Sequence, residues 1–453
     1  MHDLSSTDQV FAFMESRTNL EARGGLTRAY RLERMEALME GFNYPARRIP
    51  TIHIAGSKGK GSTAAYATAL LQSAGFTVGR YTSPHIHHYR ERIRVYEKSG
   101  EPRDVDNLYL RFGRDLYDLV QERVAAGYEE LDLPTTFELL TLLAFLVFQE
   151  ARCNIVVLET GLGGRLDATN VCHPLATIIT SIEREHTEYL GETIREIAAE
   201  KAGIIKPGIP LFLAPQTAEA REEILKRARQ VAAPVFPVEE HLSAAADPVQ
   251  EGLRTTIAAI DDTFRCIVTL PMVGMRQPWN LALAIFAVGH PSTGLLEGVS
   301  PETVSRALVH LDLPARGEIH TINTRPCILD GAHTPESVSQ LAADISRRGY
   351  APVDLLFSAV EGKETTAMIE HLVPIARSVH ITRAGTFRRS SPEQIAATWK
   401  RIAPSIPVTV SENPADAFRS VTEGGTDRSH RPIVVTGSFY LVAEIRPLVL
   451  QSR

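Results

Sequence analysis

Residues 51–65 read TIHIAGSKGKGSTAA, and this stretch decides the fold. Five β-forming residues run into a glycine-rich turn, and small helix-forming residues follow it. In such a loop, backbone N–H groups surround phosphate oxygens, the helix N-terminus adds a favourable dipole, and a lysine, here Lys60, supplies a point charge. Only two residues separate Gly56 from Gly59, unlike in the usual G-x-x-x-x-G-K-[ST] loop, so a glycine-rich turn without a ligand remains the alternative.

Around this stretch, short apolar runs alternate with helical patterns. The runs lie at residues 77–82, 155–159, 176–182 and 210–214, and the helical patterns at 62–74, 105–126, 135–150, 194–205 and 218–231. Strands that alternate with helices imply right-handed crossovers and a parallel sheet. Two runs at 254–260 and 264–270 indicate a hairpin, and hence a small antiparallel subsheet.

A second α/β pattern begins near Pro326, with strands that end at residues 330, 359, 382, 410 and 437. The short segment 311–317 contains proline and glycine, which is typical of a joint between domains. The sequence therefore predicts an α/β protein of two domains. Residues 1–313 would form a P-loop nucleotide-binding domain with a mainly parallel sheet and the antiparallel subsheet, and residues 314–453 a Rossmann-like α/β domain.

The composition of the 453 residues excludes several classes of protein. Hydrophobic residues make up 44% and charged residues 23%, which excludes disordered and collagen-like chains. The net charge of -6 argues against nucleic acid or a membrane surface as a partner. Four cysteines lie far apart in the sequence, which favours free thiols in a reducing compartment. The N-terminus lacks the pattern of a secretory signal peptide. The apolar run that ends at Phe148 is too short to cross a bilayer. We therefore expect a cytoplasmic protein with small-molecule ligands. We also expect a monomer, although the sequence does not fix the oligomeric state.

Three polar residues follow the predicted strands of the first sheet. Glu159 ends a strand at the ligand-binding edge, where it would be a natural Mg²⁺ ligand beside a phosphate loop; a carboxylate that caps the next turn is an equal alternative. His186 follows the next strand and offers an imidazole to a second metal ion, although a lone histidine is more often a surface residue. Lys201 is either a salt-bridge partner or, with a lowered pKa, a nucleophile toward CO₂.

Six sequence blocks, in this order, resemble the folate branch of the Mur ligase superfamily, which contains the folylpolyglutamate and dihydrofolate synthases. The blocks are AGSKGKGST (55–63), TSPHIHHYRERI (82–93), LETGLGGRLDATN (158–170), HTEYLGETIREIAAEKAGIIKPG (186–208), ILDGAHTPES (328–337) and VTGSFYLVAEIR (435–446). The resemblance implies an ATP-dependent amide ligase that adds L-glutamate to dihydropteroate, to (tetrahydro)folate, or to both. The substrate carboxylate would take the γ-phosphoryl group of ATP, and the amine of glutamate would attack the resulting acyl phosphate.

The same resemblance implies roles for individual residues. For ATP binding it implies Gly59, Lys60, Gly61, Ser62, Thr63, Gln277, Asn280, Arg316 and Asp330. For the pterin ligand it implies Thr135, Thr136, Phe137, Asp167 and Ala168. For catalysis it implies Lys60, His186, Lys201, Asp330 and His333. It also implies two Mg²⁺ sites, the first at Ser83 and Glu159 and the second at His186. Lys201 matches the lysine that is carbamylated in family members, whose carbamate would add an anionic oxygen near the second metal.

The chain departs from the family pattern within these blocks. Lys58 stands where the family usually has asparagine, and its charge either touches phosphate or faces solvent. Glu185 replaces the usual aspartate before the metal histidine and is long enough to orient His186. Thr334 replaces an asparagine, and the ARGEI sequence around Arg316 differs from the usual PGRLE.

Two other functions remain open. One is a Mur-type ligase for a different carboxylate and amino acid, because the TTFELLT run at 135–141 has the spacing of a plain helix core as well as the composition of a pterin site. The other is a non-catalytic nucleotide-binding protein, against which the full set of candidate catalytic residues argues.

Overall fold

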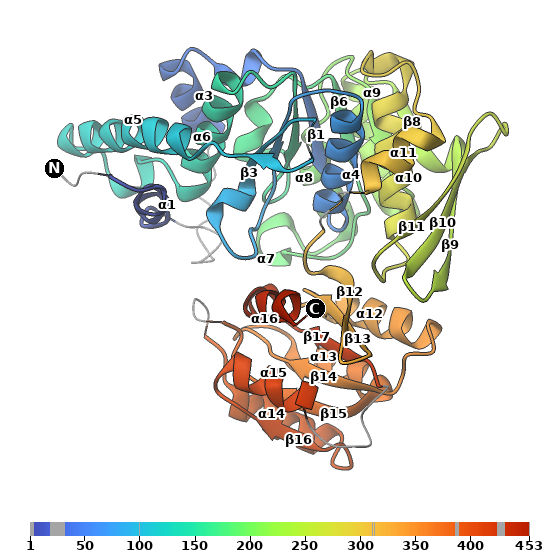
Figure 1. Cartoon of the computed structure of the whole chain (residues 1–453). Helices are drawn as coiled ribbons and strands as arrows, with labels where there is room; N and C mark the ends of the chain where they lie inside the picture. Colours follow the sequence, from blue (N-terminus) through green and yellow to red (C-terminus); the bar gives the residue numbers. More distant parts are fainter. Residues whose placement is uncertain are drawn as a thin grey trace.

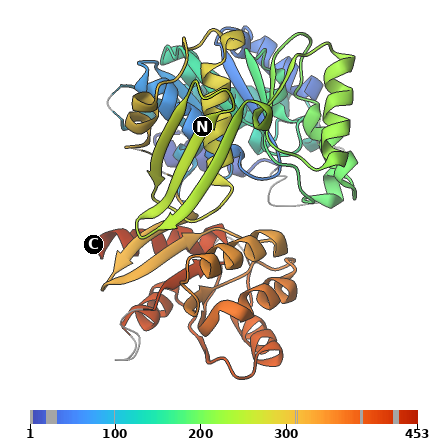
Figure 2. The ribbon, with the colours of Figure 1, turned by 90° about the vertical axis from the view of Figure 1, so that its right-hand side faces the viewer.

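The computed structural model shows two α/β domains, one stacked on the other (Figure 1). It describes residues 4–18, 32–98, 100–309, 311, 313–385, 389–423 and 431–452. In Figure 2 the antiparallel strands of the first domain reach down to the second domain. The two domains are therefore in contact along the side of the molecule as well as at the joint between them.

An eight-stranded sheet, in the order β4-β3-β2-β5-β1-β6-β7-β8, forms the centre of the first domain. The strands from β2 to β8 in that order pair in parallel, and β3 and β4 add antiparallel pairs at one edge. All residues of β1, β5 and β6 are buried, as expected for strands covered on both faces. The strands are β1 Thr51–Ala55, β2 Val78–Tyr81, β3 Ile93–Tyr96, β4 Pro102–Arg103, β5 Ile155–Glu159, β6 Ala176–Ile179, β7 Leu211–Leu213 and β8 Val235–Pro237.

Helices cover both faces of this sheet. One face packs against α1 (Thr7–Glu15), α3 (Leu32–Gly41), α5 (Asp106–Ala125), α6 (Thr136–Glu150), α8 (Ile194–Ala202) and α9 (Ala218–Gln230). The other face packs against α4 (Lys60–Ser73), α10 (Gln277–Gly289) and α11 (Pro301–Leu308). Alternate residues of β1 point to the two cores, so the loop after β1 is held from both sides. The short α7 (Thr187–Leu190) follows β6 at the carboxyl edge of the sheet.

The predicted hairpin is present, but it belongs to a sheet of three strands in the order β11-β10-β9. β10 (Gly252–Ala259) pairs antiparallel with both β9 (Leu242–Val249) and β11 (Arg265–Leu270). β9 could not be predicted from the sequence, because LSAAADPV contains few residues with β propensity.

The C-terminal domain holds a six-stranded sheet in the order β12-β13-β17-β14-β15-β16, with only β12 antiparallel. Its strands are β12 Arg316–Ile322, β13 Arg325–Asp330, β14 Val353–Phe357, β15 Ala376–Ile381, β16 Val408–Val410 and β17 Ile433–Thr436. Its helices are α12 Pro335–Arg347, α13 Thr365–Leu372, α14 Pro392–Ile402, α15 Pro414–Glu423 and α16 Phe439–Gln451. The sheet therefore begins ten residues before the predicted start at Pro326. The predicted domain boundary, between residues 313 and 314, falls in the connection between α11 and β12.

One expectation about the apolar segments was wrong. By length and composition, the segment Glu130–Glu150 is apolar enough to cross a membrane. It contains α6, and most of it is buried inside the first domain, which is the environment of a core helix. Its apolar residues therefore pack against the core of the first domain.

Candidate active site

A cavity of about 880 Å³ lies between the carboxyl edge of the first sheet and the C-terminal domain. Most of the residues predicted for the site line it. From the first domain these are Gly59, Lys60, Gly61, Ser62, Ser83, Thr135, Thr136, Phe137, Glu159, Asp167, Ala168, His186, Gln277 and Asn280, and from the second Arg316, Asp330 and His333. Thr63 and Lys201 are fully buried behind its wall. One cavity thus gathers residues that are more than 250 positions apart.

The loop after β1 has the geometry of an anion site. Gly59 adopts a φ of 94°, which favours glycine, and α4 begins at the next residue. The ammonium of Lys60 folds back and donates to the Gly56 carbonyl at 2.8 Å. A Cβ on Gly61 would lie 2.5 Å from Nη2 of Arg316, so the guanidinium from the second domain lies directly over the loop. Two cations and a helix N-terminus therefore converge where phosphate groups would bind.

Helix α10 supports this loop from behind. Gln277 donates to the Ser62 hydroxyl at 3.4 Å and accepts from the Tyr66 hydroxyl at 3.2 Å. The side chain of Asn280 packs against the α-carbon face of Gly59, where any Cβ would collide with it. The hydroxyl of Thr63, in the first turn of α4, is buried and has no hydrogen-bond partner among the residues that the structure describes. These residues fix the loop, and the place of Gln277 and Asn280 next to it agrees with the role that the resemblance implies.

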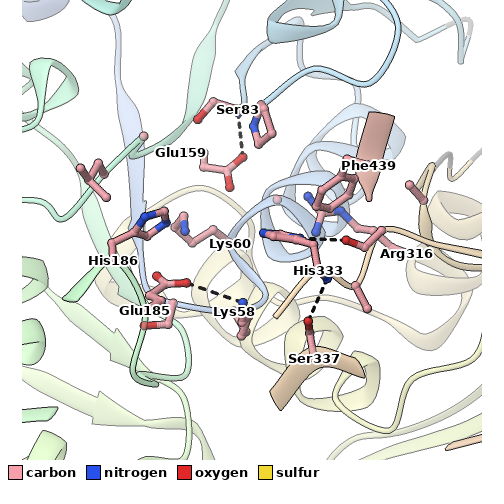
Figure 3. A pocket seen from close by; sticks show the side chains of 18 of the residues that line it. Lys58, Lys60, Ser83, Glu159, Glu185, His186, Arg316, His333, Ser337 and Phe439 are labelled. Atoms are coloured by element: carbon pink, nitrogen blue, oxygen red, sulfur yellow. Dashed lines mark hydrogen bonds and ion pairs between the residues drawn. The ribbon is translucent and has the colours of Figure 1, made fainter. Parts of the chain in front are cut away.

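Glu159 lies where a divalent cation beside the loop would be held. Its carboxylate is 2% exposed, ends β5 and accepts the Ser83 N–H at 3.2 Å (Figure 3). Burial raises the pKa of this carboxyl, and Lys60 and Arg316 oppose that rise. In the described part of the chain, no cluster of three or more His, Cys, Asp or Glu side chains forms a metal cage. A carboxylate and a serine hydroxyl nevertheless suit Mg²⁺, which typically takes one or two protein carboxylates and completes its shell with phosphate oxygens and water.

A buried charge cluster lies on the other side of the loop. Lys201 is 1% exposed, and its ammonium donates to the Gly56 carbonyl at 2.9 Å and to Glu185 at 3.0 Å. Burial lowers the pKa of Lys201 to about 8, although Glu185 opposes the shift. Burial would raise the pKa of Glu185, but Lys201, Lys60 and Lys58 outweigh it and hold that pKa at about 2.

The expected contact between Glu185 and His186 is not among the hydrogen bonds and ion pairs of the described residues, where Glu185 pairs with Lys201 and Lys58 instead. One carboxylate oxygen of Glu185 lies 3.0 Å from the Lys201 ammonium, and the other lies 3.7 Å from the Lys58 ammonium. Burial lowers the pKa of His186, so its ring is neutral at neutral pH and its unprotonated nitrogen is available to a cation.

At the other end of the cavity, the side chains implied for the pterin ligand also build its walls. The Thr135 hydroxyl caps α6, the Thr136 hydroxyl donates to the Met14 carbonyl, and Asp167 accepts the N–H groups of Gly161 and Leu162. Ala168 begins the short helical turn after Asp167. These polar groups are therefore satisfied within the protein. Phe137 packs over Gly161 and offers an aromatic face to the cavity.

The second domain contributes Asp330 and His333. Asp330, at the end of β13, accepts the Ala332 N–H at 2.8 Å, and burial raises the pKa of this carboxyl to about 7. Nδ1 of His333 lies 2.9 Å from the Gly331 carbonyl, and burial lowers the pKa of His333 to about 4. The ring of His333 lies beside Phe439, with 5.4 Å between centroids. In Figure 3, His333, Phe439 and Arg316 lie across from Glu185 and His186, with Lys58 and Lys60 between the two groups.

Several cavity residues had not been singled out from the sequence. They include His85, Arg92, Lys363 and Phe439. His85, Arg92 and Phe439 lie within the quoted blocks, so a search of those blocks for polar and aromatic residues would have found them. Lys363 follows the carboxyl end of β14, which is the position in a parallel sheet where ligand contacts gather.

Comparisons with known proteins agree with this geometry. The Mur ligase middle domain model matches residues 54–288, and the model described as dihydrofolate synthetase, C-terminal domain, matches residues 315–450. The dihydrofolate synthase/folylpolyglutamate synthase of Bacillus subtilis (strain 168) is 35% identical over 425 residues, which cover 92% of this chain and 94% of the relative. The chain therefore belongs to the folylpolyglutamate synthase and dihydrofolate synthase family of the Mur ligases.

Solved structures agree as well. The folylpolyglutamate synthase of Mycobacterium tuberculosis complexed with ADP is 27% identical, with a TM-score of 0.84 and 99% of each chain covered. An FPGS–AMPPCP–folate complex is 26% identical, with a TM-score of 0.77, and the match covers 98% of this chain and 100% of the other. The resemblance and the two-domain α/β fold predicted from the sequence are thus confirmed.

Proposed function

We propose that this protein is an ATP-dependent ligase that joins L-glutamate to dihydropteroate, to (tetrahydro)folate, or to both, with release of ADP and phosphate. One observation supports this most directly: the phosphate loop, Glu159 and the two C-terminal residues Asp330 and His333 line a single cavity. Membership of the family supports the reaction class. The Bacillus subtilis relative is named as both a dihydrofolate synthase and a folylpolyglutamate synthase, so both kinds of acceptor should be tested.

In this proposal, the loop N–H groups, Lys60 and Arg316 bind the β- and γ-phosphates. An oxygen of the acceptor carboxylate attacks the γ-phosphorus, the bond to ADP breaks, and an acyl phosphate forms. The uncharged amine of glutamate then attacks the acyl carbon, the bond from that carbon to the phosphate oxygen breaks, and phosphate and the proton of the amine are released. Phosphoryl transfer needs mainly positioning and balance of charge, which fixed cations around a rigid loop supply.

We propose Mg²⁺ at Ser83 and Glu159 and a second Mg²⁺ at His186, with a carbamate on Lys201. Bound Mg²⁺ would neutralise charge on the phosphates. The pKa of Lys201, lowered to about 8, supports the carbamate, because CO₂ reacts with the neutral amine. Incubation with ¹³C-bicarbonate should give a carbamate signal in the NMR spectrum of the wild-type protein that is missing from a Lys201→Met variant. A wild-type spectrum without that signal would contradict the modification.

The test of the function is release of phosphate from ATP by the full-length protein, with L-glutamate and either dihydropteroate or tetrahydrofolate. We expect release only when ATP, Mg²⁺, the acceptor and glutamate are all present, with a product heavier by one glutamyl residue. ATP-dependent ligation of some other acid and amino acid, with neither pterin accepted, would refute the substrates and leave a Mur-type ligase. Failure to bind ATP would refute the function altogether.

We also propose that the enzyme is a cytoplasmic monomer. The four cysteines are buried free thiols, which suits a reducing compartment. Size-exclusion chromatography with light scattering would test the oligomeric state, and fractionation of the source cells would test the location.

A further inference from the structure

Lys58 is held in the wall of the cavity by contacts of its backbone. Its N–H donates to the Ser181 carbonyl at 3.2 Å, and the Ser181 hydroxyl donates to the Lys58 carbonyl at 3.3 Å. These contacts tie the phosphate loop to the segment after β6. The side chain is 24% exposed and lines the cavity, so a backbone held on both sides presents a cationic end to the site.

Among the described residues, the ammonium of Lys58 forms one long ion pair, with Glu185. It lies 3.7 Å from Glu185, which is too far for a direct hydrogen bond. The other oxygen of the same carboxylate accepts from Lys201 at 3.0 Å, so Lys201 is the close partner of Glu185. An ammonium has three donors, and the long contact to Glu185 leaves them able to turn toward a ligand in the cavity.

Positive charge converges on the loop from both domains. Lys58, Lys60 and Arg316 line the cavity around it, and α4 begins in the loop with the positive end of its dipole. Cations gathered at a helix N-terminus in a partly desolvated place favour an anionic ligand at this end of the cavity.

We propose that Lys58 binds the terminal phosphate of the nucleotide, and that Glu185 positions Lys58 for this contact. The inference rests on the proposed function, because it concerns the same ATP site. Lys60 and Arg316 converge on the loop itself, whereas Lys58 lies between Glu185 and His333, at the side that faces the second domain (Figure 3). In the proposed function the γ-phosphate would lie on this side of the loop, so Lys58 would distinguish a triphosphate from a diphosphate.

The test compares binding of AMPPCP and of ADP, both with Mg²⁺, by calorimetry. We expect Lys58→Met to weaken AMPPCP about tenfold, the usual effect of losing one charge-assisted hydrogen bond, and ADP less than twofold. Lys58→Arg should keep most of the affinity for AMPPCP. Lys226→Met, which removes an exposed lysine on α9, is the matched control and should change neither value. Unchanged binding of ADP also shows that the variant is folded.

Equal weakening of both nucleotides by Lys58→Met would overturn the proposal, since it would indicate a role in the shape of the loop. Unchanged binding of AMPPCP would overturn it as well. A wild-type protein that binds neither nucleotide would instead refute the proposed function.

The role of Glu185 has its own test. Glu185→Asp shortens the carboxylate and should weaken AMPPCP severalfold in the wild-type background but not in the Lys58→Met background. The same loss in both backgrounds would show that Glu185 does not act through Lys58.

Discussion

Asp330 gives the sharpest test of the electrostatics of the site. Burial raises the pKa of its carboxyl from 3.8 to about 7, and the N–H of Ala332 and the charge of Arg316 lower it only in part. The folded protein therefore binds this proton more tightly than the unfolded chain does. Its contribution to stability is complete below pH 4 and is lost as the pH rises to about 7.

The substitution Asp330→Asn should remove this loss. An amide oxygen can still accept the Ala332 N–H, but no charge develops as the pH rises. A shift of about three pKa units corresponds to about 4 kcal/mol. The side chain is partly exposed to the cavity, so solvent screens part of the cost, and we expect the variant to be more stable than wild type by about 2 kcal/mol at pH 8. At pH 5 the gain should be less than half as large.

Unfolding in urea, followed by tryptophan fluorescence, measures this difference. Trp399 is fully buried in the C-terminal core, and the chain has only one other tryptophan, so a Trp279→Phe background isolates the signal of the domain that contains Asp330. A gain that is the same at pH 5 and pH 8, or a loss of stability at pH 8, would refute the assignment of the raised pKa to Asp330. The same variant should bind ATP more weakly, since its carboxylate is implied in nucleotide binding.

Three further substitutions test other parts of the structure. Glu159→Gln should lower turnover at least a hundredfold and raise the Mg²⁺ concentration needed for half-maximal phosphate release; unchanged magnesium dependence would contradict the metal role. Arg34→Met should lower the free energy of unfolding by about 3–5 kcal/mol. It removes the guanidinium that lies 2.8 Å from the buried carboxylate of Glu138 and so leaves that charge without its counter-charge. A loss below 1 kcal/mol in urea would show that this pair is dispensable. Gly59→Ala should abolish calorimetric binding of ADP, because it strains the left-handed turn and collides with Asn280.

The sequence was sufficient where a feature depends on neighbours along the chain. The phosphate loop could be predicted because its glycines, lysine and helix start lie within a few residues. Glu159 and His186 could be placed near it, because parallel strands end at one edge of a sheet. β12 could not be predicted from the sequence. Its buried and exposed residues do not alternate regularly, and its pairing with β13 is interrupted at Gly317.

Side-chain partners were harder to predict than positions. From the residues alone, nothing showed that Glu185 would reach Lys201 and Lys58 rather than His186, since that depends on the turn after β6. The residues alone also did not show that the Thr136 hydroxyl would donate a hydrogen bond to the Met14 carbonyl, 122 residues away in the chain. Side-chain contacts of this kind depend on how whole helices and strands pack together. The residue pattern within one helix or strand does not predict them.

The charges of the cavity also connect binding to the arrangement of the domains. Arg316 belongs to the C-terminal sheet, yet its guanidinium lies over Gly61 of the first domain. A bound triphosphate would therefore be shared by cations of both domains and would hold them together. Farther from the site, Arg348 donates to backbone carbonyls of the β9–β10 hairpin, so this contact also joins the domains. If the domains close on the nucleotide, Arg316 must travel with the whole second sheet, and the hairpin contact of Arg348 must either follow or break. Nucleotide binding and domain closure are then one equilibrium, because the same guanidinium contributes to both.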